Sequence, residues 1–98
     1  MPKTVKVGAH VYTVLRKSAS ALKEQLGECD FDKLQICVRK QLRKSVARET
    51  LLHEVLHATT YPSLNEKTAT DEDFVTAMSP VLLQVLQENP DLLVYLTQ

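Results

Sequence analysis

The sequence predicts an α+β fold in which a small, mainly antiparallel sheet packs on a central helix and on C-terminal helices. The first half of the chain is rich in β-branched residues, and the second half has helical periodicity. A chain of 98 residues is long enough for one modest core, so we expect residues 1–98 to form a single domain. The 44% hydrophobic and 24% charged residues are typical of a globular protein and exclude a disordered or collagen-like chain.

The chain opens with two β-prone segments. Thr4–Val7 and His10–Val14 are β-branched runs with partial alternation of apolar and polar residues. Gly8 lies between them and suits a tight turn or a bulge. This pattern predicts an opening hairpin.

The next segments predict a short helix, a turn and a further strand. Ser18–Leu26 reads as a short helix, and Gly27 is a typical stop signal at the end of such a helix. Phe31–Lys33 is predicted as a turn. Leu34–Val38 is a short, mainly apolar run, and we expect it to be the third main strand, which completes the sheet.

The pattern becomes helical between Ser45 and Thr60. At about 100° per residue, four apolar residues share one stripe that can pack on the sheet. These residues are Leu51, Leu52, Val55 and Leu56. His53 and His57 project away from the centre of that stripe. Pro62 lacks a backbone donor, so the helix is predicted to end near Tyr61–Ser63, before a polar loop that reaches Thr70.

Two further helices are predicted near the C-terminus. Thr70 suits an N-cap, because acidic residues follow it in the first turn, where the helix dipole favours negative charge. The apolar face continues to Leu86, and Ser79–Pro80 is expected either to kink the helix or to restart it. Asn89–Pro90 marks a further break. We expect Asp91–Leu96 to form a last short helix that closes the core.

A histidine pair in the central helix carries the most specific chemistry in the sequence. His53 and His57 are four residues apart, so on a helix both can present a ring nitrogen to one zinc ion. Glu54 sits one position further round, where its carboxylate can reach a metal-bound water without binding the metal. Zinc lowers the pKa of such a water to roughly 7. Glu54 is therefore the candidate general base for amide hydrolysis.

The third protein ligand is less explicit in the sequence. Ser63 stands where the longer three-histidine pattern has its third histidine, so the ligand must come from elsewhere. We choose Glu72, because a following helix that packs back antiparallel can offer a carboxylate from its first turns. Asp71 and Asp73 are close rivals. His10 is a further alternative, although nothing in the sequence fixes its direction, and we interpret it as a hairpin residue.

The charge, the hydrophobic runs and the two cysteines argue against several other classes of function. Twelve basic residues balance twelve acidic ones, so nothing in the overall charge points to nucleic acid or to a membrane surface. The basic run Arg39–Lys44 contains no aromatic residue for base stacking, and we interpret it as a solvated approach to the helix. No apolar run is long enough to cross a bilayer. Cys29 and Cys37 are interpreted as reduced structural thiols, which fits a cytoplasmic protein.

The segment Arg48–Ala58, followed by Glu72–Val75 and Leu82–Pro90, resembles short zincin-like metallopeptidases of phages and prophages. These look like minimal relatives of the ImmA/IrrE and SprT-like peptidases. The resemblance extends from about Gly27 to Leu93, and the histidine motif is its chemically specific part.

The resemblance implies a compact zincin-like fold and a zinc site. It implies His53 and His57 as ligands, Glu54 as the catalytic glutamate, and Glu72 as the third ligand of the gluzincin type. It also implies a cytoplasmic setting in a bacterium or a phage-infected cell, and a protein or peptide as the substrate. The chain has no room for a specificity subdomain or a DNA-binding appendage.

Two functions remain open on the sequence alone. The first is a zinc peptidase that acts on an extended segment of another protein, which could add to an edge of the sheet. The second is a non-catalytic interaction protein, in which the same cluster binds zinc for stability or binds no metal. Zinc is the preferred ion, yet the same ligands also suit iron, cobalt or manganese. The sequence does not indicate an oligomeric state.

Overall fold

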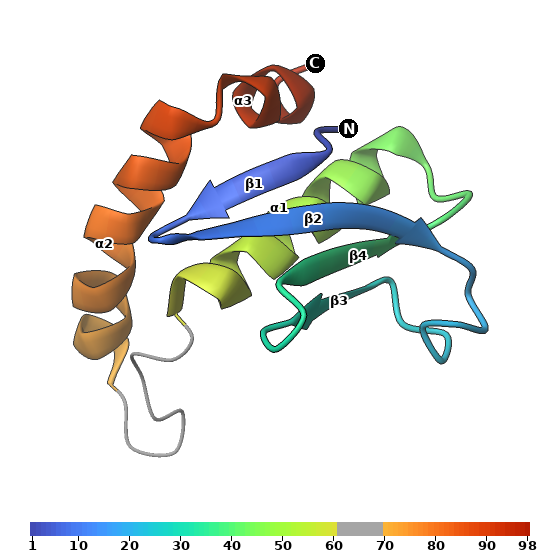
Figure 1. The fold of residues 1–98 in the computed structure, drawn as a ribbon, viewed down its shortest axis with the longest axis horizontal. Helices are drawn as coiled ribbons and strands as arrows, with labels where there is room; N and C mark the ends of the chain where they lie inside the picture. The colour runs from blue at the N-terminus through green and yellow to red at the C-terminus, as the bar shows by residue number, and fades with distance from the viewer. Residues whose placement is uncertain (61–69) are drawn as a thin grey trace.

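The described residues of the computed structural model, 1–60 and 70–98, form one sheet and three helices that pack against it (Figure 1). The strands are β1 (Thr4–Val7), β2 (His10–Lys17), β3 (Gly27–Asp30) and β4 (Gln35–Arg39), and the helices are α1 (Lys44–Thr60), α2 (Asp71–Glu88) and α3 (Pro90–Leu96). None of these helices is long and apolar enough to cross a lipid bilayer. The α+β class predicted from the sequence is confirmed.

The sheet has the strand order β1-β2-β4-β3. Strands β1 and β2 form the predicted antiparallel hairpin, and Gly8 adopts a left-handed φ of 60° at its turn. Strand β4 runs parallel to β2, with Val14 opposite Ile36, and β3 runs antiparallel to β4. Two of these three pairings are antiparallel, so the sheet is mainly antiparallel, as predicted. Strands β1 and β3 are its two edges.

The helix predicted over Ser18–Leu26 is wrong, because the structure has only turns there. Lys23 and Glu24 adopt left-handed φ angles of 52° and 66°, which a helix does not allow. A single helical turn does begin, since the amide of Leu22 donates to the carbonyl of Ser18. Leu22 is then buried outside the main core, and this burial favours a compact loop over a longer helix.

Gly27 does not end a helix but begins strand β3, which the sequence analysis missed. The strand predicted over Leu34–Val38 is the fourth in the chain and starts one residue later, at Gln35. Leu34 still belongs to the turn, with a left-handed φ of 53°. Its side chain packs against the core, which compensates for an uncommon backbone conformation.

Helix α1 packs on the sheet through a stripe that differs from the predicted one. Leu51 and Val55 are fully buried, as expected, but Leu52 is 37% exposed. The buried positions of α1 are Ala47, Thr50, Leu51, Glu54, Val55, Ala58 and Thr59. Small residues on this stripe bring the helix close to the sheet, and Glu54 becomes part of the buried face. The helix ends at Thr60; the residues predicted to end it, 61–63, and the polar loop that follows lie outside the described part of the chain.

The predicted cap of α2 is confirmed. The hydroxyl of Thr70 accepts from the amide of Asp73, and the carboxylate of Asp73 accepts from the amide of Thr70. The helix continues through Pro80 without the restart that we considered. Asn89 separates it from α3, which begins at Pro90, one residue before the predicted start.

Helix α2 and the residue that follows it, Asn89, cover the edge strand β1 with two side-chain amides. The amide of Lys6 donates to Asn89 Oδ1 at 2.9 Å, and the carbonyl of Lys6 accepts from Asn89 Nδ2 at 3.0 Å and from Gln84 Nε2 at 3.1 Å. The amide of Gly8 donates to Gln84 Oε1 at 2.8 Å. Main-chain groups that a neighbouring strand would normally pair with are thus satisfied by α2.

We expect Asn89→Ala to lower the free energy of unfolding by about 1–3 kcal/mol, because the amide of Lys6 loses its partner and its carbonyl keeps only Gln84. Urea unfolding followed by circular dichroism measures this. Gln87→Ala is the matched control, since Gln87 is an exposed amide two residues away, at the end of α2. Equal stability of the two variants would show that the amide contacts contribute little.

Candidate metal centre

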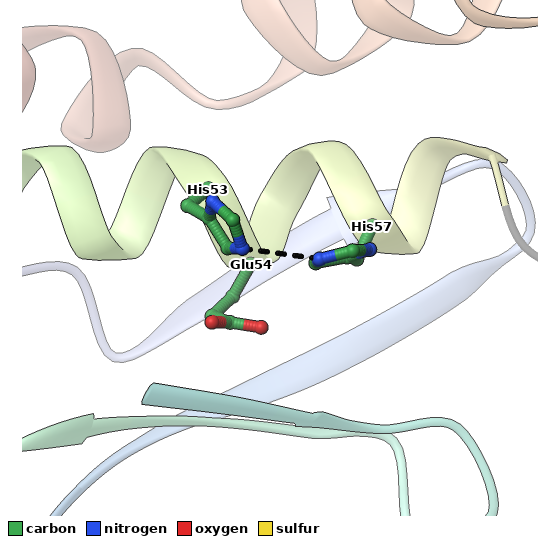
Figure 2. A group of neighbouring side chains, drawn as sticks. All are labelled: His53, Glu54 and His57. Atoms are coloured by element: carbon green, nitrogen blue, oxygen red, sulfur yellow. Dashed lines mark hydrogen bonds between the residues drawn. The ribbon is translucent and has the colours of Figure 1, made fainter. Parts of the chain in front are cut away.

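The exposed face of α1 carries the histidine pair, whose rings already meet. Residues four apart lie one above the other on a helix, so His53 and His57 project from the same side. Their Nε2 atoms are 3.1 Å apart, and their ring centroids are 4.7 Å apart with the planes at 72° (Figure 2). Both side chains are exposed, as the sequence predicts.

The separation of the two nitrogens suits a shared metal ion. Two nitrogens at 2.0–2.1 Å from one tetrahedral ion of the size of zinc lie roughly 3.3 Å apart. The observed 3.1 Å also fits an N–H···N hydrogen bond in which one ring donates and the other accepts. In either case the two rings are already arranged so that little movement would be needed to bind one ion.

Glu54 completes the group from the buried side of the same helix. It is 7% exposed, and its side chain extends toward the strands, whereas the histidines lie on the outer side of α1 (Figure 2). One ligand atom from each of His53, Glu54 and His57 lies within 4.8 Å of the other two. The three residues therefore form a group that could hold a metal ion.

Burial raises the pKa of the Glu54 carboxyl above its ordinary value. The neighbouring His53 and His57 lower the same pKa, and the carboxylate of Glu28 raises it, but burial is the largest of these effects. A raised pKa brings a carboxylate closer to the range in which it can both accept and return a proton near neutral pH.

Gly27 makes room for the Glu54 carboxylate. A Cβ atom at this position would lie 2.7 Å from Thr50 Cγ2, 2.9 Å from the carbonyl oxygen of Cys37 and 3.0 Å from Glu54 Oε2. Each distance is shorter than ordinary van der Waals contact, and one of the contacts is to backbone. A glycine is therefore needed where α1 crosses the start of β3.

A shallow pocket opens at the three-residue group. Its lining combines the group with the start of β3 and the turn that follows: Gln25, Gly27, Glu28, Cys29, Phe31, His53, Glu54 and His57. The residues of β3 were not predicted to belong to the site, because no strand was predicted at Gly27–Asp30. The one signal available was Gly27, and it was interpreted as a helix stop.

Cys29 lies in this pocket as a free, partly buried thiol. Burial raises its pKa to about 12, and the carboxylates of Glu54 and Asp30 act in the same direction. Cys37 is also free and is buried. The interpretation of both residues as unbridged thiols is confirmed.

We expect iodoacetamide to label Cys29 roughly 10²–10³-fold more slowly in the folded protein than in urea at pH 8, because the thiolate is the reactive form. Mass spectrometry of timed samples gives the rate for each cysteine. Rapid labelling of Cys29 in the folded protein would contradict the high pKa.

The described candidates for the third ligand, Glu72, Asp73 and His10, are not part of the three-residue group. Glu72 is exposed in the first turn of α2, where its Oε1 accepts from Thr76 Oγ1 at 3.4 Å. The carboxylate of Asp73 is engaged in the helix cap. His10 is exposed at the start of β2 and lines a different pocket. The side chain of Asp71 lies outside what the structure describes.

The pocket therefore joins residues from α1 and β3, and the group at its centre has the donor types of a metal centre. Comparison with known proteins adds no assignment: no family model, no curated protein and no solved structure matches this chain.

Proposed function

We propose that this protein is a zinc-dependent peptidase of the cytoplasm, in which His53 and His57 hold the metal and Glu54 acts as general base. The convergence of these three side chains on one helix is the observation that carries the proposal. A bound zinc ion would polarise a carbonyl and make a bound water acidic near neutral pH.

Glu54 suits the proton transfers of peptide hydrolysis. Its buried carboxylate lies beside the histidine pair, so it can take a proton from a water held there and return it to the leaving amine. Burial favours the protonated form that the second transfer requires, and the positive field of a bound metal would favour the ionised form that the first requires.

The edge strand β3 supports an extended peptide as the substrate. Arg39 donates its amide to the carbonyl of Leu26 at 2.8 Å, so Leu26 and Arg39 form a hydrogen-bonded pair. Such pairs alternate with non-hydrogen-bonded ones along an antiparallel ladder. The main-chain groups of Gly27 and Cys29 then point outward, beside the pocket, where a peptide strand could pair with them.

Glu72 remains our proposal for the third ligand. Among the acidic residues considered in the first turn of α2, its carboxylate is exposed and takes no part in the helix cap. Helices α1 and α2 pack against each other, so a movement of the first turn of α2 along α1 could bring Glu72 toward the histidines. Metal binding by Glu72 is therefore proposed separately from metal binding by His53 and His57.

Metal content tests the proposal directly. Protein purified without a histidine tag is incubated with zinc, desalted and measured by elemental analysis, together with His53→Ala and Glu72→Ala. His10→Ala is the matched control, because it removes a histidine outside the group. We expect about one zinc per chain in the wild type and in His10→Ala, and loss in His53→Ala. Absence of zinc from the wild type would overturn the proposal, whereas retention in Glu72→Ala would exclude only that ligand.

A further inference from the structure

The end of the molecule where α1 begins gathers positive charge from three segments. Seven of the twelve lysines and arginines lie in this basic end, which comprises Arg16–Lys17, Arg39–Lys40, Arg43–Lys44 and Arg48. In the sequence, only residues 39–44 stand out as a basic run. The fold brings the basic residues at the end of β2 and in the first turns of α1 close to this run.

Backbone pairing holds the strand ends of this basic end together. Lys17 lies directly opposite Arg39 in the parallel ladder of β2 and β4. The amide of Lys40 donates to the carbonyl of Lys17 at 2.8 Å. The guanidinium of Arg16 donates to the carbonyl of Arg39 at 3.0 Å. These positively charged residues are therefore held next to one another.

Helix α1 completes the basic end from the other side. A small cavity of about 230 Å³ has Arg16, Lys44 and Arg48 in its wall, together with Leu42 and Tyr95. Arg48 is held in place, because its Nε donates to the carbonyl of Tyr95 at 3.2 Å and its guanidinium lies 6.0 Å from the centre of the Tyr95 ring.

Among the described residues, no carboxylate lies within 4.0 Å of a charged nitrogen of the basic end. In residues 1–60 and 70–98, the ion pair within 4.0 Å joins Lys6 in β1 to Glu88 in α2, away from the basic end. Glu24 reaches Arg39 with its main-chain carbonyl, not with its carboxylate. The surface field of this end is therefore positive although the chain as a whole is neutral, and an acidic partner would be attracted to it.

The start of β3, at the open edge of the sheet, lies next to the basic end. Gly27, the first residue of β3, pairs with Val38, which directly precedes Arg39. The helix rises 1.5 Å per residue, so Lys44 lies roughly 14 Å from His53 along α1. An extended peptide covers that length in about four residues.

We propose that the basic end docks an acidic segment of a partner polypeptide. A peptide partner is favoured over nucleic acid because the neighbouring edge of β3 offers main-chain donors and acceptors, and because Tyr95, the aromatic ring at this end, is already packed against Arg48. On the proposed function, the partner is the substrate, with its acidic residues about four positions from the bond that is cleaved.

Fluorescence anisotropy with a labelled peptide of alternating glutamate and serine tests the docking without turnover. The protein is kept with a chelator, and a peptide with glutamine in place of glutamate is the neutral probe. We expect binding of the acidic peptide only, weakened about tenfold by the double change Arg43→Glu and Lys44→Glu. The matched control, Lys6→Glu with Lys33→Glu, changes the net charge equally at exposed positions away from the basic end and should weaken binding less than about threefold.

Three results would overturn the docking proposal: no binding of the acidic peptide at low salt, equal weakening by both double variants, or tighter binding of a DNA duplex than of the peptide. Circular dichroism melts establish that the double variants fold. His53→Ala should bind the acidic peptide as the wild type does, so failure of the metal proposal and failure of the docking proposal are distinguishable.

Discussion

Glu54→Gln is expected to keep its metal while hydrolysis falls by roughly 10²–10⁴-fold, because glutamine retains the shape of the side chain but cannot accept a proton. The same variant should melt at a higher temperature than the wild type when both are free of metal. Both effects come from one carboxylate that is buried beside the histidine pair.

The stability effect of Glu54→Gln depends on pH in a defined direction. The folded protein holds the Glu54 proton more tightly than the unfolded chain does, since burial raises the pKa above its ordinary value of 4.5. The wild type therefore loses stability as the pH rises from 4.5 through the raised pKa, and glutamine does not. We expect nearly equal melting temperatures at pH 4 and an advantage of about 2–6 °C for Glu54→Gln at pH 7.5.

Glu49→Gln is the control for this pair of measurements, because Glu49 is an exposed acid on the same helix. It should change neither hydrolysis nor the pH dependence of melting. If Glu54→Gln binds metal and hydrolyses peptides like the wild type, Glu54 is not the base. If the wild type binds zinc but hydrolyses no peptide, the non-catalytic function that the sequence left open becomes the better explanation.

Gly27→Ala is expected to lower the free energy of unfolding by about 1–3 kcal/mol, which corresponds to a melting temperature lower by roughly 5–15 °C. The added methyl group would meet Thr50, the carbonyl of Cys37 and Glu54 at once. Relief requires α1 and β3 to move apart, which would also displace Glu54 from the histidines. Thermal melts and metal titration measure the two consequences.

Two further variants separate crowding at Gly27 from a general effect of replacing glycine. Gly27→Ala combined with Thr50→Ser removes the methyl group at the shortest of the three contacts, so part of the lost stability should return. Gly8→Ala has open space around its Cβ but a left-handed backbone, so it should cost about 1 kcal/mol and leave the metal centre unchanged. No recovery in the double variant would rule out crowding as the cause.

The parts of the fold that were predictable from the sequence depend on local patterns. The opening hairpin follows from β-branched runs on either side of Gly8, and the cap of α2 follows from Thr70 and the acids after it. The grouping of His53, Glu54 and His57 follows from helical spacing alone once α1 is predicted. Each of these features is decided within a few residues.

The missed parts depend on contacts that are distant in sequence. Strand β3 has only four residues, Gly27–Asp30, and two of them are acidic, so its pattern resembles a loop. Lys23 and Glu24 favour helix locally, yet both adopt left-handed backbone after Leu22 becomes buried. The position of Gly27 under Thr50 could not be foreseen, since nothing in either segment encodes the distance between them.

The amides of Gln84 and Asn89 occupy main-chain groups of Lys6 and Gly8 on the β1 edge, which makes β3 the edge better suited to extension of the sheet. Unlimited stacking of copies through their sheets needs two free edges on each copy, one to give and one to receive. Copies of this chain that paired through their sheets would therefore join β3 to β3 about a two-fold axis and stop at two. Because the candidate metal centre lies beside β3, such a pair would place both candidate centres next to its seam, where a peptide could no longer pair with either β3 strand.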